Sequence, residues 1–351
     1  MKTDIRSDSS VLLQVEDLKK HFPIQAGVFR RVVNHVKAVD GVSFQLKRGE
    51  TLGLVGESGC GKTTTGRCIP RLVEPTSGKI LFQHENEIVD LAKVDPHHLK
   101  ELRKDVQIVF QDPVSSLDPR MTVRDIIGEP VFVNENLTRR QIIDTVAEIL
   151  ELVGLMPDHM NRYPHEFSGG QRQRIGIARS LILKPELVIC DEPVSALDVS
   201  IQAQIITLLE DLQEQLDLTY LFVAHDLAVV EHISDRVAVM YLGKIVGLGA
   251  TDEIFQRPNH PYTELLMYSI PVPGQVSGDR KLVEGDVPSP ANPPPGCPFH
   301  TRCPYVKDIC RTEVPELIPR GEEPLHLSAC HRVGEIDLKG FHEIREAILE
   351  Q

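Results

Sequence analysis

A glycine-rich loop near residue 60 is the first part of the chain whose residue types could do chemistry. It matches G-x-x-x-x-G-K-[ST] at every fixed position, and with the next threonine it comprises Gly56, Glu57, Ser58, Gly59, Cys60, Gly61, Lys62, Thr63 and Thr64. In such a P-loop the backbone N–H groups curve around phosphates, the lysine adds a mobile positive charge, and the following threonine supplies a hydroxyl for Mg2+. A predicted strand over 51–55 before the loop and a predicted helix after it favour this interpretation over a chance glycine-rich turn.

Two carboxylates end an apolar run later in the chain. Residues 187–190 are apolar or nearly so, and Asp191 and Glu192 follow directly. At the carboxyl end of a parallel strand next to the P-loop, we expect Asp191 to hold Mg2+ through water and Glu192 to polarise a water in line with a γ-phosphate. Such a pair is a Walker B motif with a catalytic glutamate. Standing alone, the two acids would favour an exposed turn instead.

A second candidate anion site begins at a serine. The segment consists of Ser168, Gly169, Gly170 and Gln171, and a stretch with helical character over 172–183 follows it. Serine is a favoured N-cap residue, and the free N–H groups at a helix start bind anions. We therefore expect Ser168 to cap a helix whose start is an anion site.

The elements that position these residues alternate along the chain. Short β-rich apolar runs predict strands over 51–55, 106–110, 187–191, 220–224 and 237–241, and helical spacing predicts helices over 142–153 and 201–212. This alternation indicates an α/β fold with helices on both faces of the sheet. Two further strands, around 12–15 and 36–46, are expected to form an antiparallel edge, with residues 23–37 as an inserted loop. Pro70 should kink or end the helix that begins near Lys62.

The stretch FSGGQRQR, between the P-loop and the carboxylate pair, resembles the signature of ABC-type ATPases. The chain contains the other motifs of that family in order: Gln111 matches the Q-loop glutamine, Asp198 ends a D-loop match, and His225 matches the switch histidine. Six elements in sequence over 56–225 make an accidental resemblance negligible. Phe167 stands where the signature usually begins with leucine, which changes a packing residue. The resemblance implies an ABC-type P-loop ATPase core with an antiparallel β edge subdomain and a helical subdomain over about 112–182.

The resemblance narrows to the ATP-binding subunits of oligopeptide and dipeptide ABC importers, a group that includes nickel uptake systems. It is carried by residues 110–130 and by the segment Asn259-His260-Pro261-Tyr262-Thr263, which opens a C-terminal region in that group. The last 101 residues hold 14 of the 25 prolines, so composition also changes near residue 250. We expect a nucleotide-binding domain over 1–250 and a small irregular Cys-rich C-terminal domain over 251–351.

The resemblance also implies how the motifs are used. ATP is sandwiched in a head-to-tail dimer with a second ABC ATPase subunit, a paralogue in a heterodimer, because P-loop and signature face each other only across that interface. One site would combine this chain's P-loop, Gln111, Asp191, Glu192 and His225 with the partner's signature, and this chain's signature and Asp198 would complete the other. Mg2+ would be held by Thr63, Gln111 and Asp191, and the catalytic residues would be Glu192, His225 and Gln111. Uptake of peptides or similar small solutes would follow from ATP hydrolysis.

Two further roles come from the resemblance. An aromatic side chain from the N-terminal sheet usually stacks on adenine, and we choose Phe22, with Phe29 as the rival. The segment from Gln111 to about residue 155 would dock a cytoplasmic helix of the permease, and Gln111 would be its hinge. The alternative is that this segment is only a scaffold for the signature helix.

Four of the seven cysteines fall within 34 residues near the C-terminus: Cys297, Cys303, Cys310 and Cys330. Clustered thiols in a reducing cytosol suggest a metal site before disulfides, and the spacing differs from the C-x2-C of ordinary zinc modules. Four sulfurs in a proline-rich loop suit a [4Fe-4S] cluster, which occurs here in members of the resembled group. A zinc site and free thiols are the alternatives, and His300 and His331 are alternative ligands. We expect a structural role for the metal.

Charge and hydropathy restrict the partners. The formal net charge of −13 opposes nucleic-acid binding, and no run reaches the 18 or so apolar residues of a membrane span. Together with these observations, the resemblance implies a peripheral subunit on the cytoplasmic face of the inner membrane. It also implies two integral membrane permease subunits as partners and, indirectly, an extracytoplasmic solute-binding protein. The alternative function is an ABC-type ATPase helper subunit of a soluble multienzyme complex.

Overall fold

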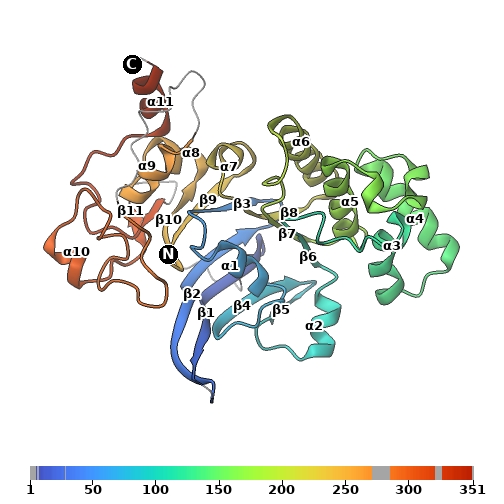
Figure 1. Cartoon of the computed structure of the whole chain (residues 1–351), viewed down its shortest axis with the longest axis horizontal. Helices are drawn as coiled ribbons and strands as arrows, with labels where there is room; N and C mark the ends of the chain where they lie inside the picture. Colours follow the sequence, from blue (N-terminus) through green and yellow to red (C-terminus); the bar gives the residue numbers. More distant parts are fainter. Residues whose placement is uncertain (1–4, 6–7, 28, 271–284, 321–325, 350–351) are drawn as a thin grey trace. The chain divides into compact units, whose positions relative to one another are not determined.

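The computed structural model describes residues 5, 8–27, 29–270, 285–320 and 326–349 (Figure 1). Those parts of the expected domains that fall on other residues lie outside this description. Within it, the backbone packs as two compact units: the first comprises residues up to 13, 46–51 and 81–223, and the second comprises 14–45, 52–80 and 224 onward. Each unit is described by itself.

The structure contains both strands and helices along most of its length. The strands are β1 Val11–Ala26, β2 Arg31–Lys47, β3 Thr51–Val55, β4 Ser77–His84, β5 Glu87–Asp90, β6 Val106–Val109, β7 Leu187–Asp191, β8 Thr219–Val223, β9 Arg236–Tyr241, β10 Lys244–Ala250, β11 Ile318–Arg320 and β12 His326–Ser328. The helices are α1 Lys62–Cys68, α2 Pro96–Leu102, α3 Val123–Asn134, α4 Arg139–Leu152, α5 Gly169–Leu181, α6 Val199–Leu216, α7 Leu227–Ile233, α8 Thr251–Gln256, α9 Pro261–Met267, α10 Asp308–Thr312 and α11 Phe341–Leu349. Short 3-10 turns cover Pro157–Asn161 and Pro164–Glu166.

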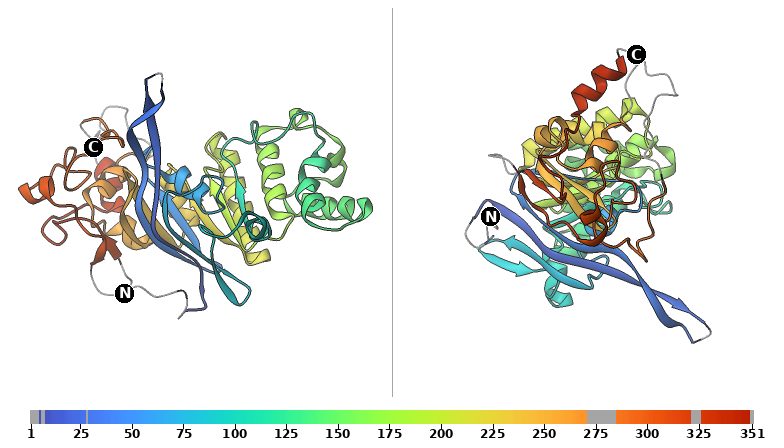
Figure 2. Two further views of the ribbon diagram at one scale, coloured as in Figure 1. Left: turned by 90° about the horizontal axis from the view of Figure 1, so that it is seen from below. Right: turned by 90° about the vertical axis from the view of Figure 1, so that its left-hand side faces the viewer.

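The first unit is built on three parallel strands in the order β8-β7-β6. Every residue of β7 and β8 is buried, which explains why both appear in the sequence as unbroken apolar runs. Helices α3, α4 and α5 contact one another, and the left view of Figure 2 shows them side by side. They form the helical part that was predicted to start near residue 112.

The second unit contains the P-loop strand. Strand β3 pairs in parallel with β9, β9 pairs antiparallel with β10, and β10 continues antiparallel to β12 and β11. All five residues of β3 are buried. Because β3 and β9 are parallel, their carboxyl ends lie at the same edge, where the P-loop begins.

Residues 23–37 were expected to be an inserted loop, and this prediction was wrong. Strands β1 and β2 are 16 and 17 residues long and form a long hairpin that closes near Gly27 (Figure 1). In the far part of β1, four of the last eight residues are exposed and the other four are half-buried. A ribbon exposed on both faces shows no alternation of apolar and polar residues, so periodicity could not detect it.

Several other predictions can be compared with the structure. Helix α1 ends at Cys68, two residues before Pro70, as the missing proline N–H requires. Strands β4, β5 and β10 were not predicted. The C-terminal region was expected to be irregular, yet its described residues form α8 to α11 and two strands, β11 and β12. None of the helices in the described part of the chain has the length and apolar character needed to cross a membrane.

Two glycines give a matched test of this packing. A Cβ at Gly53 in β3 would lie 2.5 Å from Val230 Cγ1 and 2.6 Å from Ser234 Oγ, so Gly53→Ala should lower the free energy of unfolding by about 1–3 kcal/mol. A Cβ at Gly176 in α5 meets nothing within 4 Å, so Gly176→Ala should raise stability by about 0.5–1 kcal/mol through the lower backbone entropy of alanine. Thermal unfolding of the two variants checks both signs. Equal shifts in the same direction would contradict the packing at β3.

Candidate functional site

The P-loop requires glycine at two positions because other backbone passes close by. A Cβ at Gly56, where φ is 151°, would lie 2.2 Å from the carbonyl oxygen of Met240 in β9. A Cβ at Gly61, where φ is 108°, would lie 2.1 Å from the carbonyl oxygen of Ala38. No side chain fits at either position. The exposed crest of the loop is formed by Ser58 and Gly59.

Lys62 is the first residue of α1 and is 4% exposed. Its Nζ donates to the carbonyl oxygen of Gly56 at 2.8 Å and to that of Glu57 at 3.1 Å. The ammonium group therefore folds back over the start of the loop. Phosphate oxygens bind a lysine more strongly than neutral carbonyls do, so a phosphate group in the loop would compete with these two acceptors.

In the first unit, parallel pairing brings two predicted residues together. Val109 of β6 is in register with Cys190 of β7, and the chain continues from these positions to Gln111 and Glu192. Gln111 Nε2 donates to Glu192 Oε2 at 2.9 Å. The neighbouring Asp191 is fully buried at the end of β7. The contact between the Q-loop glutamine and the candidate general base is thus present in the structure.

Glu192 has a constrained backbone. Its φ of 50° lies in the left-handed region, which is uncommon for residues other than glycine. Its N–H donates to the carbonyl oxygen of Val223 at 2.9 Å, and its own carbonyl accepts from Ser195 N at 3.3 Å and Ser195 Oγ at 3.1 Å. Strained conformations persist where surrounding contacts over-determine them, and they cluster at functional sites.

The signature helix begins as predicted. Ser168 Oγ accepts from Gln171 N at 3.3 Å, and Gln171 Oε1 accepts from Ser168 N at 3.0 Å, so the two residues form a capping box at the start of α5. Ser168 and Gly169 are exposed. Phe167 is 4% exposed and contacts the ring of His159 edge-on, which agrees with a packing role.

The remaining predicted residues lie at element ends. Asp198 caps α6 by accepting from Ile201 N at 3.0 Å. His225 is exposed and immediately precedes Asp226, the N-cap of α7. Phe22 in β1 is 39% exposed, and Lys20 Nζ lies 4.8 Å from its ring centroid. His225, Phe22 and the P-loop belong to the second unit, whereas Gln111, Asp191, Glu192, Asp198 and the signature belong to the first.

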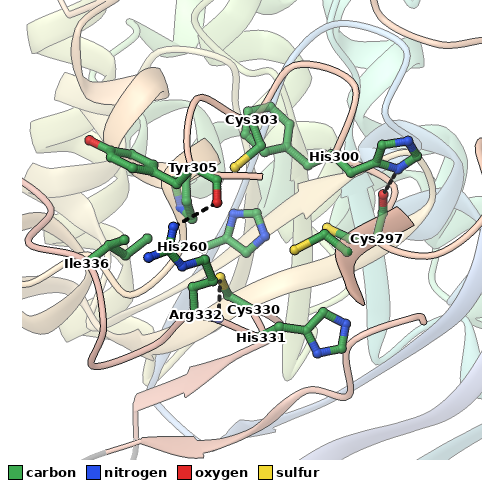
Figure 3. Close-up of a pocket in the computed structure, with 12 residues that line it drawn as sticks. His260, Cys297, His300, Cys303, Tyr305, Cys330, His331, Arg332 and Ile336 are labelled. Atoms are coloured by element: carbon green, nitrogen blue, oxygen red, sulfur yellow. Dashed lines mark hydrogen bonds between the residues drawn. The ribbon is translucent and has the colours of Figure 1, made fainter. Parts of the chain in front are cut away.

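The four C-terminal cysteines line a single pocket in the second unit. Figure 3 shows Cys297, Cys303 and Cys330 on different sides of this pocket with their sulfur atoms directed inward. Its wall also includes Cys310 and the residues His260, His300 and His331. Residues up to 33 positions apart therefore supply four thiols to one place, which sequence spacing alone could not establish.

Burial favours the neutral form of two of the thiols in this pocket. Burial raises the pKa of Cys297 to about 12 and that of Cys303 to about 11. The presence of four sulfur donors in one pocket suits a group that is bound by four thiolates. However, nowhere in the described residues are three or more His, Cys, Asp or Glu side chains arranged so that they could hold a metal ion. The predicted [4Fe-4S] cluster, and the zinc alternative, are not confirmed.

Two residues that touch the P-loop were not assigned a role from the sequence. Tyr262 Oη accepts from Glu57 N at 2.8 Å, and Arg302 forms a two-pronged ion pair with the Glu57 carboxylate. Tyr262 lies in the segment at 259–263 that carried part of the resemblance, so a signal existed for it. Nothing in the sequence singled out Arg302, which is 245 positions from Glu57.

Comparisons of the sequence with known proteins identify the family of this chain. The sequence model of the ABC transporter family matches residues 39–195, and that of the oligopeptide/dipeptide transporter C-terminal region matches residues 246–310. The chain is 55% identical over 329 residues to the oligopeptide transport ATP-binding protein AppF of Bacillus subtilis, covering 93% of this chain and 98% of AppF. It is 52% identical over 313 residues to OppF of Salmonella typhimurium, covering 88% of this chain and 92% of OppF.

Solved structures give the same assignment. The dimeric ATP-binding cassette MJ0796 in a post-hydrolysis state with ADP and Pi has a TM-score of 0.60 at 26% identity, covering 68% of this chain and 99% of that one. The cbiO1 protein of Clostridium perfringens, part of the ABC transporter complex cbiONQ, has a TM-score of 0.60 at 29% identity, covering 70% of this chain and 91% of that one. The resemblance found in the sequence is thus confirmed. The chain belongs to the ABC transporter family, in the group that carries the oligopeptide/dipeptide transporter C-terminal region, and it is an ATPase of that family.

Proposed function

We propose that this chain hydrolyses ATP at a head-to-tail interface with a second ATP-binding subunit and so drives uptake of peptides through a membrane permease. The contact between Gln111 and Glu192 at 2.9 Å carries the proposal for hydrolysis, because it holds a carboxylate in a defined place after β7. Peptides are the proposed solute class because AppF and OppF, both named as oligopeptide transport proteins, match nearly the whole chain.

The proposed chemistry follows from the residues present. Glu192 would accept a proton from the attacking water, and Gln111 would orient both the water and the carboxylate. Lys62 would exchange its bonds to the Gly56 and Glu57 carbonyls for bonds to phosphate oxygens and so stabilise charge on them. His225, exposed before α7, would contact the γ-phosphate as the switch histidine.

Mg2+ is the ion that this family requires with ATP. The proposed ligands Thr63, Gln111 and Asp191 offer a hydroxyl, an amide and a carboxylate, and such hard oxygen donors fit Mg2+. When bound, the ion would neutralise phosphate charge. The first turn of α1, which carries Thr63, ends well before Pro70 and keeps its helical geometry.

The signature of this chain would serve the other ATP of the dimer. The exposed Ser168 and Gly169 at the start of α5 present free N–H groups, which suits a phosphate contact with a partner subunit. Asp198, at the start of α6, would lie at the same interface. We propose that the partner is a paralogue and that adenine stacks on Phe22, which is partly exposed in β1.

The proposed membrane partners are two permease subunits and, through them, an extracytoplasmic solute-binding protein. Helix α3 leaves Phe132 73% exposed and Val133 54% exposed, which supports a docking role for the helical part between β6 and α5. The chain would then act as a peripheral subunit at the cytoplasmic face of the inner membrane. In this arrangement residues 1–250 are the ATPase core and residues 251–351 the C-terminal appendage.

We further propose that the four cysteines hold a [4Fe-4S] cluster with a structural role. The support is the common pocket that they line. Binding would have to remove the thiol protons, because iron is bound by thiolates, and a nearby cation lowers the pKa that burial has raised.

The general-base assignment can be tested with one substitution. Glu192→Gln keeps the shape of the side chain but cannot accept a proton, so we expect steady-state ATP hydrolysis by the transporter complex to fall about 100-fold or more while ATP binding persists. Glu214→Gln, on the exposed face of α6, is the matched control and should leave turnover unchanged. Near-normal turnover of Glu192→Gln would exclude Glu192 as the general base.

The proposed partners can be identified by affinity purification of the tagged chain from solubilised membranes. An importer subunit should recover two polytopic membrane proteins and a second ATP-binding subunit. Recovery of soluble enzyme subunits without any polytopic protein would instead identify a helper of a multienzyme complex.

The metal proposal predicts iron and acid-labile sulfide in the anaerobically purified full chain. Cys303→Ser removes one pocket thiol and should abolish both signals, whereas Cys68→Ser, a buried thiol of α1 outside the pocket, should retain them. One equivalent of zinc without iron would reject the cluster in favour of the zinc site. Absence of both metals would leave the cysteines as free thiols.

A further inference from the structure

Glu57, the second residue of the P-loop, has each of its polar groups engaged. Its N–H donates to Tyr262 Oη at 2.8 Å, and its carbonyl accepts from Lys62 Nζ at 3.1 Å. Its carboxylate accepts from Arg302 Nη1 at 2.7 Å and from Arg302 Nη2 at 2.8 Å. Glu57 is therefore where the phosphate-binding lysine and the C-terminal region meet.

Arg302 is held in place by aromatic rings. Its side chain is 5% exposed, and its guanidinium carbon lies 5.9 Å from the ring centroids of both Tyr241 and Phe299. The ring centroids of Tyr241, Tyr262 and Phe299 are 4.6 to 5.4 Å apart, so they form one cluster. Tyr241 is the last residue of β9, the strand that pairs with the P-loop strand. The guanidinium group of Arg302 is thus packed against this aromatic cluster next to the P-loop.

The ion pair is the compensation for burying this arginine. Arg302 Nε is buried and has no hydrogen-bond partner among the described residues, so the two bonds to Glu57 are its main stabilisation. A planar guanidinium can bind both oxygens of one carboxylate, which a lysine cannot do. Removing the arginine would leave the carboxylate of Glu57 as an unbalanced negative charge inside the loop that receives phosphates.

The geometry also bears on what happens when phosphate binds. Lys62 must release the carbonyls of Gly56 and Glu57 to reach phosphate oxygens, and the start of the loop then loses two of its internal hydrogen bonds. The bonds from Arg302 and Tyr262 to Glu57 do not involve the lysine. They can therefore keep the loop backbone in place while the lysine changes partners, which lowers the cost of binding by preorganisation.

We propose that Arg302 and Tyr262 are positioning residues for the nucleotide: through Glu57 they hold the P-loop in its binding conformation and cancel the charge of its carboxylate. The C-terminal region, from the segment at 259–263 to the four-cysteine loop, is on this view part of the ATP-binding apparatus. The inference rests on the proposed function of the P-loop as the ATP site. Arg302 directly precedes Cys303, so the same loop contributes to the pocket and to the nucleotide site.

A double-mutant cycle measured with MgATP on the full chain in its transporter complex tests this proposal. Arg302→Met should weaken MgATP binding about tenfold, the size expected for loss of a charge-assisted pair near a phosphate site. Glu57→Gln alone should also weaken binding, because it leaves the buried Arg302 without its charged partner. The double variant should return to within about threefold of wild type, because removing both partners leaves no unpaired charge. Arg302→Lys, which keeps the charge, should fall between wild type and Arg302→Met.

A second arginine of the same region provides the control. Arg332 lines the four-cysteine pocket and donates to Tyr305 O and to the Glu335 carboxylate. These partners lie outside the P-loop, so Arg332→Met should leave MgATP affinity unchanged. The kinetic readout is a raised KM for ATP with little change in kcat for Arg302→Met. The proposal is overturned if the double variant remains as weak as Arg302→Met, or if Arg332→Met weakens binding equally, since both outcomes indicate general disruption of the C-terminal region.

Lys62→Ala separates this inference from the function on which it rests. Loss of MgATP binding in Lys62→Ala together with unchanged binding in Arg302→Met would overturn only the positioning role. Full MgATP affinity in Lys62→Ala would overturn the assignment of the P-loop itself.

Discussion

Parallel strand pairing is the constraint on which the candidate site depends. Parallel neighbours end at the same edge of a sheet, so the loops that follow them are brought together without any contribution from the loop residues. In the first unit, β6 and β7 place Gln111 against Glu192. In the second unit, β3 and β9 place the P-loop against the end of β9, where Met240 and Tyr241 lie. Strands β3 and β7 are fully buried and β9 nearly so, and the candidate functional residues lie just beyond the strand ends.

The backbone near these strand ends adopts conformations that most residues avoid. Gly56 and Gly61 have no room for a Cβ, and Glu192 adopts a left-handed backbone conformation although it is not glycine. Hydrogen bonds to Val223 and Ser195 maintain the backbone conformation of Glu192. A strained residue held by several fixed partners keeps its side chain in one place, which a general base needs.

The C-terminal region has two faces with different chemistry. One surrounds a pocket lined by four cysteines, and burial raises the pKa of two of their thiols, those of Cys297 and Cys303. The other supplies Arg302 and the aromatic cluster that contact the P-loop. Phe299 lies within the cysteine loop and packs on Tyr241 and Tyr262, so the two faces are joined by a few residues. A change in the fold of the cysteine loop would therefore alter the packing of Arg302, which binds the Glu57 carboxylate.

The sequence by itself determined the motifs and the elements that carry them. The strand ends at residues 55 and 191, the serine cap of α5 and the end of α1 before Pro70 were all predicted, because each depends on neighbours within a few residues. Only the tertiary structure decided the hairpin of β1 and β2, which lacks a buried face to produce a pattern, and the C-terminal strands, which form by pairing with β10. It also decided the pairing of Arg302 with Glu57 and the gathering of the four cysteines, because contacts between residues far apart in the chain depend on how the intervening elements fold.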